Sequence, residues 1–380
     1  MGRPDTLVSV WQAQIRVDLD AIRHNVALLR AGTSAEMMAV VKGDGYGHGM
    51  LPVARAALDA GADWLGGCTL GEALALRAAG ITAPVLAWLL APGLPLHEGV
   101  AADVDLSAAS LGGLAEVVAA ARTAGRPARL HLKVDTGLAR GGATVPDWPA
   151  LVEAAAKAVA DGTVEVVGVW SHFASADVPG DPANDAQLRT FRDALDVAAR
   201  YGIVPRYRHM ANSAATLTRR DAHFDLVRPG IAVYGLTPVP GVDFGLRPAM
   251  TVCATVMLVK RVPAGQGVSY GHTYTTPRET TLAVVPLGYA DGVPRSGSGR
   301  APVWVAGRAR PIAGRVCMDQ VVVDCGDDPV SAGDPAVLFG PGAGGEPTAD
   351  DWAAACNTIN YEIVTRMGSV RVPRVYEGDQ

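Results

Sequence analysis

Polar residues that can do chemistry stand where apolar runs of the sequence end. Lys42 ends the run from residue 37 to 41, and Lys133 lies near the end of a second run. His172, Ser213 and Arg228 close or follow three later runs. Only four of the 33 basic residues are lysines, so two lysines in such places are unusual. Amine, imidazole and hydroxyl groups at one edge of a sheet suit acid–base or nucleophilic chemistry.

Lys42 leads from an apolar run into a glycine-rich turn that spans residues 43–49. A lysine in this position is partly removed from water, which lowers its pKa and makes its amine a better nucleophile. Glycine also lets a ligand approach the backbone closely. A solvated lysine at a strand end is the alternative interpretation. The density of glycines favours the functional one.

The last two apolar runs of the first part of the chain contain a candidate phosphate site. Ser213 follows the seventh run, and Gly230 and Ile231 lie on the eighth. The loops after strands seven and eight are the recurrent phosphate site of (β/α)8 barrels, where a hydroxyl and backbone amides can hold the anion. An ordinary loop serine and a structural glycine are the alternative. A nucleophilic lysine and a phosphate cradle in one barrel mouth would together form a pyridoxal phosphate site.

Eight apolar runs alternate with amphipathic, alanine-rich segments between Asp18 and about Gly235. The runs are continuous, as in a parallel sheet covered on both faces. The expected strands cover residues 37–42, 64–69, 84–90, 103–107, 129–136, 164–173, 207–213 and 225–235. The expected helices include residues 49–60, 69–79, 111–124, 147–160 and 185–201. This count of strands favours a (β/α)8 barrel over the alternative, a doubly wound open sheet.

The pattern changes after Arg247. Valine-rich segments separated by glycine and proline turns replace the long helices, apart from one helix expected at residues 349–356. These features predict a smaller, mainly antiparallel β domain. We therefore expect an α/β chain with a (β/α)8 barrel at residues 13–243 and a β domain formed by residues 1–12 and 244–380. The segment 12–17 is an isolated strand that could instead join the β domain.

The composition limits the partners and the compartment. A net charge of −5 gives no basic field for nucleic acid or an anionic membrane. Five cysteines without a C-x-x-C pair disfavour a disulfide framework and a zinc site, so we expect no metal. The longest apolar stretch, residues 84–92, is too short to span a bilayer, and no secretory signal is visible. A cytoplasmic protein acting on a small molecule is expected.

The segment 40–49, which contains Lys42 and Tyr46, resembles the cofactor-binding signature of the alanine racemases, a family of fold type III pyridoxal phosphate enzymes. The similarity continues in order along nearly the whole chain. Its further segments are residues 133–140, 171–174, 209–214, 225–231, 234–235, 268–271, 288–292, 314–319 and 358–362. The resemblance implies bound pyridoxal 5'-phosphate and the interconversion of L-alanine and D-alanine, which supplies D-alanine for peptidoglycan.

The resemblance implies two catalytic bases. Lys42 would bond to the cofactor as an imine and, once displaced by the substrate, act as the base on the D face. Tyr270, in the β domain, would be the base on the opposite face, supplied across the interface of a homodimer with shared active sites. Moving a Cα proton from one face of a planar centre to the other is simplest with two such groups.

The resemblance also implies binding roles. Arg228 would face the pyridine nitrogen and be hydrogen-bonded to His172, and because arginine keeps its proton the ring should stay neutral. Arg140 would contact the phenolic oxygen of the cofactor, and the Met318 amide would bind the substrate carboxylate. Lys133 corresponds to a lysine that many members carry carbamylated, its new carboxylate orienting Arg140. The residues that would hold the phosphate are Tyr46, Ser213, Gly230, Ile231 and Tyr361.

Some positions depart from the family, and some alternatives stay open. Gly43 and Gly45 stand where alanine is common, which loosens the turn, and Leu138 replaces a frequent methionine without a change in volume. Without the resemblance, Tyr270 would be interpreted as a surface aromatic and His172 as a core histidine. The alternatives are a broad-specificity or serine racemase or a basic amino-acid decarboxylase of the same fold, and a non-enzymatic cofactor carrier.

Overall fold

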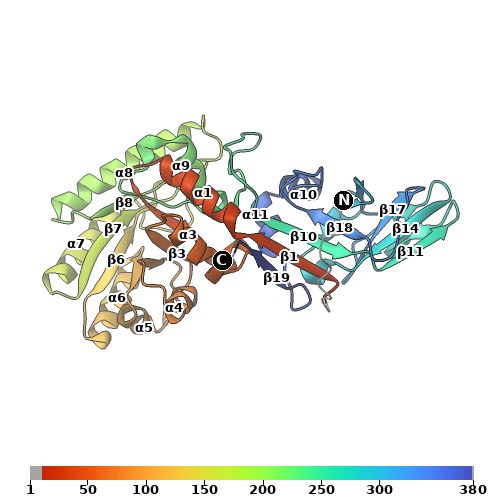
Figure 1. The fold of residues 1–380 in the computed structure, drawn as a ribbon. Helices are drawn as coiled ribbons and strands as arrows, with labels where there is room; N and C mark the ends of the chain where they lie inside the picture. The colour runs from red at the N-terminus through yellow and green to blue at the C-terminus, as the bar shows by residue number, and fades with distance from the viewer. Residues whose placement is uncertain (1–10, 379–380) are drawn as a thin grey trace. The chain divides into compact units, whose positions relative to one another are not determined.

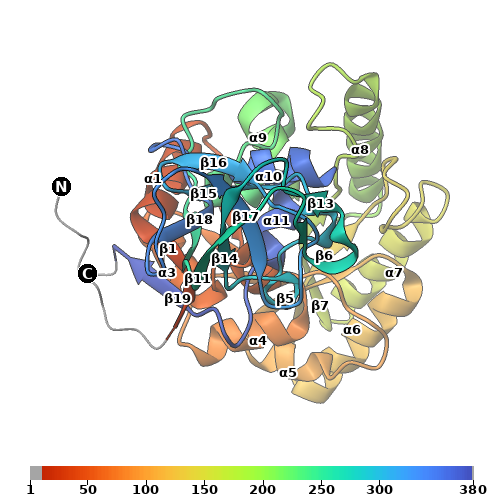
Figure 2. The ribbon, with the colours of Figure 1, turned by 90° about the vertical axis from the view of Figure 1, so that its right-hand side faces the viewer.

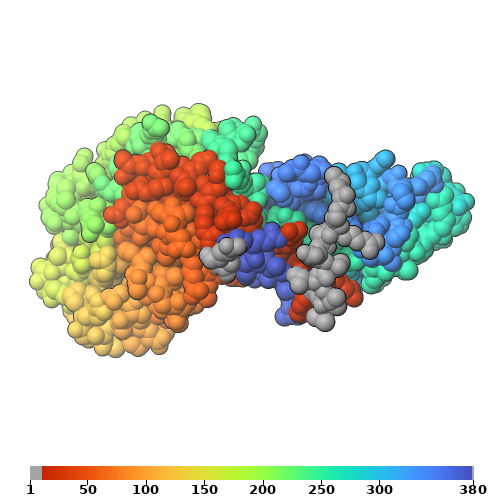
Figure 3. All heavy atoms as spheres, in the orientation of Figure 1, coloured from red at the N-terminus to blue at the C-terminus, as the bar shows by residue number. Residues whose placement is uncertain are grey.

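The computed structural model of the protein describes residues 11–378, which Figure 3 shows in colour. The chain forms two compact units. The barrel unit contains residues 22–45 and 50–246, and the β unit contains residues 46–49 and 247–378 together with the chain up to residue 21. The domain expectation for residues 1–10 lies outside the described residues.

The barrel unit is built around eight strands in the order β8-β7-β6-β5-β4-β3-β2-β9, and every neighbouring pair is parallel. At the two ends of this order, the Asp225 amide donates to the Arg208 carbonyl at 3.1 Å and the Arg228 amide to the Ala211 carbonyl at 2.9 Å. These bonds close the sheet into a barrel, which confirms the expected fold class. The strands are β2 (Glu36–Val40), β3 (Trp64–Gly67), β4 (Val85–Ala87), β5 (Val104–Ala108), β6 (Ala128–Lys133), β7 (Val164–Trp170), β8 (Tyr207–His209) and β9 (Leu226–Val227).

Helices connect successive strands and lie outside them, as α4 to α8 show in Figure 1. Local signals set their ends. The Thr69 hydroxyl accepts from the Glu72 amide while the Glu72 carboxylate accepts from the Thr69 amide, which fixes the start of α4. The helices are α1 (Leu19–Ala31), α3 (Met50–Asp59), α4 (Leu70–Ala78), α5 (Leu96–Ala101), α6 (Leu111–Ala124), α7 (Trp148–Ala160), α8 (Pro182–Arg200) and α9 (Ser213–Thr218).

One apolar cluster of the barrel unit draws its side chains from six strands. Its buried members are Met38, Trp64, Leu86, Val167, Tyr207 and Leu226, and Trp88 packs against them. Burial of these large side chains stabilises the barrel. The strands are thereby held in register, and their carboxyl ends meet at one edge, where a barrel places its functional groups.

The β unit contains a six-stranded sheet in the order β16-β15-β18-β10-β1-β19, a three-stranded sheet β11-β14-β17 and the hairpin β12-β13. Figure 2 looks onto these strands. All pairs are antiparallel except β1 with β19, so the unit is mainly antiparallel, as expected. Its elements are β1 (Ala13–Asp18), β10 (Met250–Thr255), β11 (Leu258–Val262), β12 (Gly267–Val268), β13 (Tyr274–Thr275), β14 (Thr280–Val285), β15 (Pro302–Val305), β16 (Arg308–Pro311), β17 (Val321–Gly326), β18 (Pro335–Phe339), α10 (Ala349–Cys356), α11 (Asn360–Arg366) and β19 (Arg374–Glu377).

Strand β1 differs from the expected boundary at residue 13. It pairs with β10, with Val17 opposite Met250, and with β19, with Ile15 opposite Arg374. Its side chains alternate between buried and exposed or half-exposed, which is typical of a sheet with one face in the core. This pairing places residues 13–18 in the β unit and not in the barrel.

Candidate active site

Five of the residues singled out from the sequence form a basic cluster at the carboxyl ends of the barrel strands. Lys133 is the last residue of β6, and the others follow β2, β6, β7 and β9. Within residues 11–378, the side chains of Lys42, Lys133 and Arg140 make no hydrogen bond and no ion pair. Unpaired positive charge of this kind marks an anion site. The basic cluster comprises Lys42, Lys133, Arg140, His172 and Arg228.

Two tryptophans support the cations of the cluster. The Lys133 Nζ lies 4.4 Å from the centre of the Trp170 ring, and the Arg228 guanidinium carbon lies 4.9 Å from the same ring. The Lys42 Nζ lies 5.7 Å from the centre of the Trp88 ring. The two indoles meet edge to face at 6.2 Å. Cation–π attraction to these two rings therefore stabilises the positive charges of the cluster, which no carboxylate of the described residues pairs with.

Both lysines of the cluster have lowered pKa values. Burial lowers the pKa of Lys42, and the charges of Arg140 and Arg228 add to this effect. Burial and the same two arginines lower the pKa of Lys133 to about 8. Each amine is therefore deprotonated more readily than a surface lysine, as a nucleophile or base must be.

Arg228 is 5% exposed and is held by four acceptors. Its Nη1 donates to His209 Nδ1 at 3.0 Å, and its Nη2 to the Ser171 carbonyl at 2.8 Å, to His172 Nδ1 at 3.3 Å and to the Met210 carbonyl at 3.4 Å. Burial lowers the pKa of Arg228 to about 9, so the guanidinium is charged at neutral pH. Burial and the Arg228 charge hold the pKa of His172 well below 6.5, so its ring is neutral and can accept. The expected contact between Arg228 and His172 is present.

Ser213 begins α9 and is buried. Its hydroxyl accepts from the amide of Gly230 at 2.8 Å and from that of Ala232 at 3.3 Å. The Gly230 amide, which was expected to help hold the phosphate, therefore already has an acceptor within the protein. The Ile231 amide donates to no described residue although Ile231 is fully buried, so it needs a partner. Ser213 and Ile231 are the strongest candidates for an anion cradle here.

The turn after Lys42 is left-handed. Gly43, Asp44 and Gly45 have φ values of 62°, 53° and 61°, within the segment Lys42–Tyr46 that carries the label α2. Two glycines in a left-handed turn remove the steric penalty that a Cβ atom brings there, so they favour this conformation rather than merely loosening it. Glu72 fixes the turn, because its carboxylate accepts from the Gly43 amide at 2.7 Å.

Two candidates lie on exposed turns of the β unit. Tyr270 is 70% exposed and Met318 is 58% exposed. Ser269, just before Tyr270, has φ +61°, and its hydroxyl donates to the Arg315 carbonyl at 2.7 Å, which holds this strained turn. The Met318 carbonyl accepts from the Ala290 amide at 2.8 Å, while its own amide donates to no described residue. An aromatic hydroxyl and a free amide are thus both presented outward.

Tyr46 and Tyr361 lie together in the β unit, with ring centres 6.4 Å apart. Residues 46–49 pack tightly there. A Cβ atom on Gly47 would lie 2.3 Å from the Val364 carbonyl oxygen, so only glycine fits at residue 47. The chain that leaves the Lys42 turn is therefore anchored beside α11.

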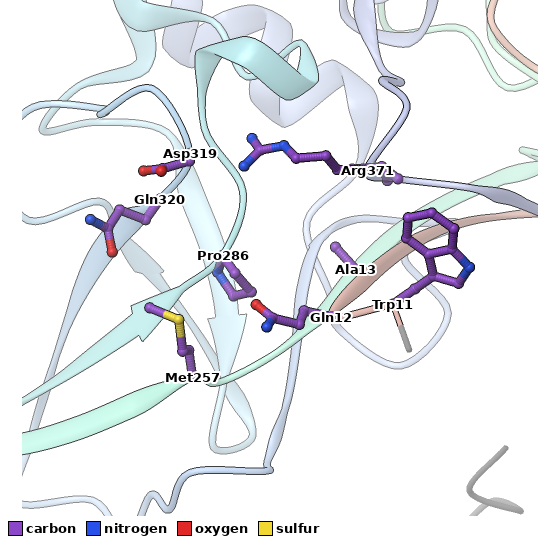
Figure 4. A pocket seen from close by; sticks show the side chains of 9 residues that line it. Trp11, Gln12, Ala13, Met257, Pro286, Asp319, Gln320 and Arg371 are labelled. Atoms are coloured by element: carbon purple, nitrogen blue, oxygen red, sulfur yellow. The ribbon is translucent and has the colours of Figure 1, made fainter. Parts of the chain in front are cut away.

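The β unit also contains a pocket of about 320 Å³. Figure 4 shows its lining, in which the carboxylate of Asp319 and the guanidinium of Arg371 are the charged groups. None of the site residues expected from the sequence lines this pocket. The chemistry-bearing groups of the barrel unit form the better candidate, because they combine burial, positive charge and lowered pKa values.

Several residues of the site were not found from the sequence. Trp88 and Trp170 were assigned to strands without a role, and Glu72 to a helix. In residues 11–378 no cluster of His, Cys, Asp and Glu is suited to a metal ion. Over the same residues no helix is long and apolar enough to cross a membrane.

The barrel carries a desolvated lysine after its first strand and a buried arginine after its last. These features place the protein among the (β/α)8-barrel enzymes that use a lysine amine as nucleophile or base. Comparison with known proteins identifies the family. Residues 17–238 match the alanine racemase N-terminal domain, and residues 249–376 match the alanine racemase C-terminal domain. The chain belongs to the alanine racemase family.

Individual relatives agree with this assignment over their full length. The alanine racemase of Salinispora arenicola is 73% identical over 98% of this chain and 100% of its own, and that of Thermobifida fusca is 61% identical over 96% and 98%. The crystal structure of alanine racemase from D-cycloserine-producing Streptomyces lavendulae superposes with a TM-score of 0.96 at 56% identity, covering 98% of each chain. That of the Bacillus anthracis enzyme with bound L-Ala-P has a TM-score of 0.88 at 36% identity, covering 98% of this chain and 96% of its own.

Proposed function

We propose that the protein interconverts L-alanine and D-alanine with pyridoxal 5'-phosphate as its cofactor, in the cytoplasm, and supplies D-alanine for peptidoglycan. The observation that carries this proposal is full-length identity of 73% to an alanine racemase, together with the basic cluster at the barrel mouth. The solved relatives are alanine racemases, and the one from Bacillus anthracis holds L-Ala-P.

The residues present fit this cofactor. The buried Ile231 amide lacks a partner among the described residues, and Lys42 and Arg140 carry charge that no described carboxylate neutralises. A phosphate ester with a phenolic oxygen is the kind of dianionic or trianionic ligand that such a site attracts. Arg228 keeps its Nε without a partner among the described residues, so it can donate to a ring nitrogen. Tyr46, Tyr361, Ser213, Gly230 and Ile231 would bind the phosphate.

When bound, the cofactor supplies an electron-accepting ring that makes the Cα proton of the amino acid acidic. The residues of this chain do the rest. The Lys42 amine would hold the cofactor covalently and, when free, would exchange a proton with Cα on one face. Its lowered pKa suits both tasks. Arg228 would donate to the ring nitrogen and, because its guanidinium stays charged at neutral pH, would leave that nitrogen unprotonated. His172 supports Arg228 through its Nδ1.

The β unit would contribute the second half of the site. The Tyr270 hydroxyl would exchange the proton on the opposite face, and the Met318 amide, which is free to donate, would bind the substrate carboxylate with Arg140. Both groups are exposed on turns of the β unit. We propose that they are supplied by a second copy of the chain in a homodimer with shared active sites. The β domain of residues 244–380 then carries one of the two catalytic bases.

Lys133 would carry a carbamate. Its pKa of about 8 leaves a large fraction of neutral amine near pH 8, and this amine can attack carbon dioxide. The new N–C bond forms as the amine loses a proton to solvent, so the positive side chain becomes negative. A carboxylate at this position would pair with Arg140 and orient it toward the cofactor.

A chiral assay tests the proposed reaction. Purified protein incubated with L-alanine and pyridoxal 5'-phosphate should form D-alanine, and Lys42→Ala and Tyr270→Phe should each lose about 10³-fold or more of this activity. Absence of D-alanine from the wild type would overturn the proposal. Preferential racemisation of serine or of larger amino acids would assign the protein to a broad-specificity or serine racemase instead.

The dimer is tested separately. If Tyr270 acts across subunits, activity should fall on dilution in step with dissociation measured by sedimentation. A mixture of Lys42→Ala and Tyr270→Phe proteins should regain activity, because hybrid dimers contain one intact site. Full activity in a demonstrated monomer would contradict the shared site.

A further inference from the structure

A chain of buried polar side chains runs through the barrel interior to Arg228. The Arg228 Nη1 lies 3.0 Å from His209 Nδ1, and His209 Nε2 lies 2.9 Å from His131 Nδ1. His131 Nε2 lies 3.0 Å from an oxygen of Asp105. The two histidines are fully buried, and Asp105 is 1% exposed. None of Asp105, His131 and His209 has a part in the proposed reaction.

The two ends of this chain set the direction of every hydrogen bond in it. A guanidinium can only donate, so His209 Nδ1 must accept and its proton must be on Nε2. His209 Nε2–H then donates to His131 Nδ1, which places the His131 proton on Nε2 as well. That proton points at Asp105, which is an acceptor when ionised. All three hydrogen bonds are satisfied in one arrangement only, with both rings singly protonated at Nε2.

Neighbouring aromatic rings and a glycine hold the two histidines of this hydrogen-bonded series in place. The Trp170 indole stacks on His209 at 5.7 Å with only 3° between the planes, and Trp64 meets His131 edge to face at 5.7 Å. A Cβ atom on Gly168 would lie 2.2 Å from His131 Nδ1, so glycine leaves the space that this ring fills. These contacts leave a space that fits the flat ring of His131 and hold both rings in place.

Charge and burial keep the hydrogen-bonded side chains from Asp105 to Arg228 in this arrangement. At the far end, Arg129 donates to Asp105 through Nε at 2.7 Å and through Nη2 at 3.2 Å. Burial raises the pKa of Asp105, but the hydrogen bonds from His131 and Arg129 and the charge of Arg129 more than offset this effect and hold the pKa below the usual range, so Asp105 is an anion. Burial and the Arg228 charge hold the pKa of His209 well below 6.5, so its ring carries one proton.

We propose that Asp105, His131 and His209 are positioning residues, which form a one-way hydrogen-bonded relay that orients the Arg228 guanidinium at the barrel mouth. His209 is the acceptor of Nη1, whereas the other three acceptors of Arg228, two carbonyls and the neutral imidazole of His172, all bind its Nη2. The relay alone fixes Nη1 and links Arg228 to a carboxylate. The proposal rests on the proposed function in one respect: the orientation matters because Arg228 then presents its remaining N–H groups to the cofactor ring.

The relay itself is tested without the cofactor. In full-length protein labelled with ¹⁵N-histidine, long-range ¹H–¹⁵N spectra show which ring nitrogen carries the proton. The signals are assigned with His131→Gln and His209→Gln. We expect both rings in the Nε2–H form at pH 8. A proton on Nδ1 of either residue, or two protons on either ring, would overturn the relay, whether or not the protein proves to be a racemase.

A second measurement tests whether the relay acts through Arg228. His131→Leu interrupts it, whereas His131→Gln keeps one donor and one acceptor. We expect His131→Leu to weaken pyridoxal 5'-phosphate binding about fivefold, the effect of one lost hydrogen bond, and to shift the absorption band of the bound cofactor. We expect His131→Gln to keep both close to the wild-type values.

His223→Leu is the matched control. His223 is also buried in the barrel unit, where it is hydrogen-bonded to Thr33 and to the Thr216 carbonyl and has no contact with Arg228. Both leucine variants should melt at a lower temperature, but only His131→Leu should alter the cofactor band. Equal spectra for the two leucine variants would contradict the proposal. If His131→Leu does not fold, His131→Phe takes its place, because a phenyl ring fills the same space but forms no hydrogen bond with Asp105 or His209. A cofactor band in His131→Phe that equals the wild-type band would contradict the proposal.

Discussion

The two proposed bases differ in chemistry, so removing one of them should affect the two enantiomers unequally. Tyr270→Phe removes only a hydroxyl, and Lys42 remains on the other face. We expect exchange of the Cα proton of L-alanine with deuterium from D₂O to fall by about 10²–10⁴-fold, the usual contribution of a general base. Exchange from D-alanine should persist, because Lys42 can remove and return that proton. Proton NMR follows both reactions.

The control for this experiment is Tyr289→Phe, a second exposed tyrosine of the β unit with no proposed role. It should leave both exchange rates unchanged. Equal losses for L-alanine and D-alanine in Tyr270→Phe would contradict the assignment of one base to each face.

Ser213 is proposed to donate its hydroxyl proton to the phosphate while its oxygen accepts hydrogen bonds from the amides of Gly230 and Ala232. Ser213→Ala removes a hydroxyl donor to a charged ligand, a hydrogen bond worth about 1.5–3 kcal/mol. The Kd for pyridoxal 5'-phosphate should therefore rise by about tenfold or more, measured by equilibrium dialysis. Thr218→Ala, on the same helix, removes a hydroxyl that only donates to the Ala214 carbonyl, and should leave the Kd unchanged. Similar values for the two variants would exclude Ser213 from the phosphate site.

Residue types and spacing were enough to find much of the basic cluster, because these side chains stand at the ends of apolar runs and in the segments that resemble the family. The tryptophans could not be found in this way. Trp88 and Trp170 lie on different strands, and only the closed barrel brings their rings together. His131 did leave a signal: in the run Arg-Leu-His-Leu-Lys it stands between two leucines that are both fully buried. A polar residue inside an apolar strand requires a buried partner.

At the scale of elements, the left-handed turn after Lys42 makes a prediction about its two glycines. Both have φ near +60°, where alanine costs about 1 kcal/mol. A Cβ atom on Gly43 meets nothing within 4 Å, whereas on Gly45 it would lie 3.2 Å from the Met50 amide nitrogen. Gly45→Ala should therefore lower the melting temperature more than Gly43→Ala. An equal or reversed order in thermal unfolding followed by circular dichroism would contradict this geometry.

The eight strands of the barrel were predictable because parallel strands buried on both faces leave continuous apolar runs. Their ends were less predictable. The run 225–235 yields only the short strand β9, because Pro229 and Gly230 interrupt it, and residues 231–234 form a 3-10 helix. Helices α5 and α9 have six residues each, too few to show a helical period. Strand β1 was ambiguous because it pairs with partners more than two hundred residues away in the sequence.

At the scale of the whole molecule, buried neutral histidines make stability depend on pH. Burial, with the Arg228 charge, holds the pKa values of His172 and His209 well below 6.5. The unfolded chain binds a proton at each of these residues below about pH 6.5, and the folded chain does not. The free energy of unfolding should therefore fall as the pH falls below 6.5, by about 2.7 kcal/mol per pH unit for two such groups.

This slope can be measured by urea unfolding between pH 7.5 and 5. His172→Asn removes one of the two groups and should reduce the slope by about half. Stability that is constant or rises as the pH is lowered through this range would show that the buried histidines are protonated in the folded protein.

The central claim is that pyridoxal 5'-phosphate is bound covalently to the Lys42 amine. Reduction of the cofactor-loaded protein with borohydride makes this bond permanent, and mass spectrometry of proteolytic fragments then locates it. The account predicts a single pyridoxyl group on Lys42, and none on Lys133, whose pKa is also lowered. A label on Lys133 or any other residue, or protein that takes up no cofactor, would contradict it.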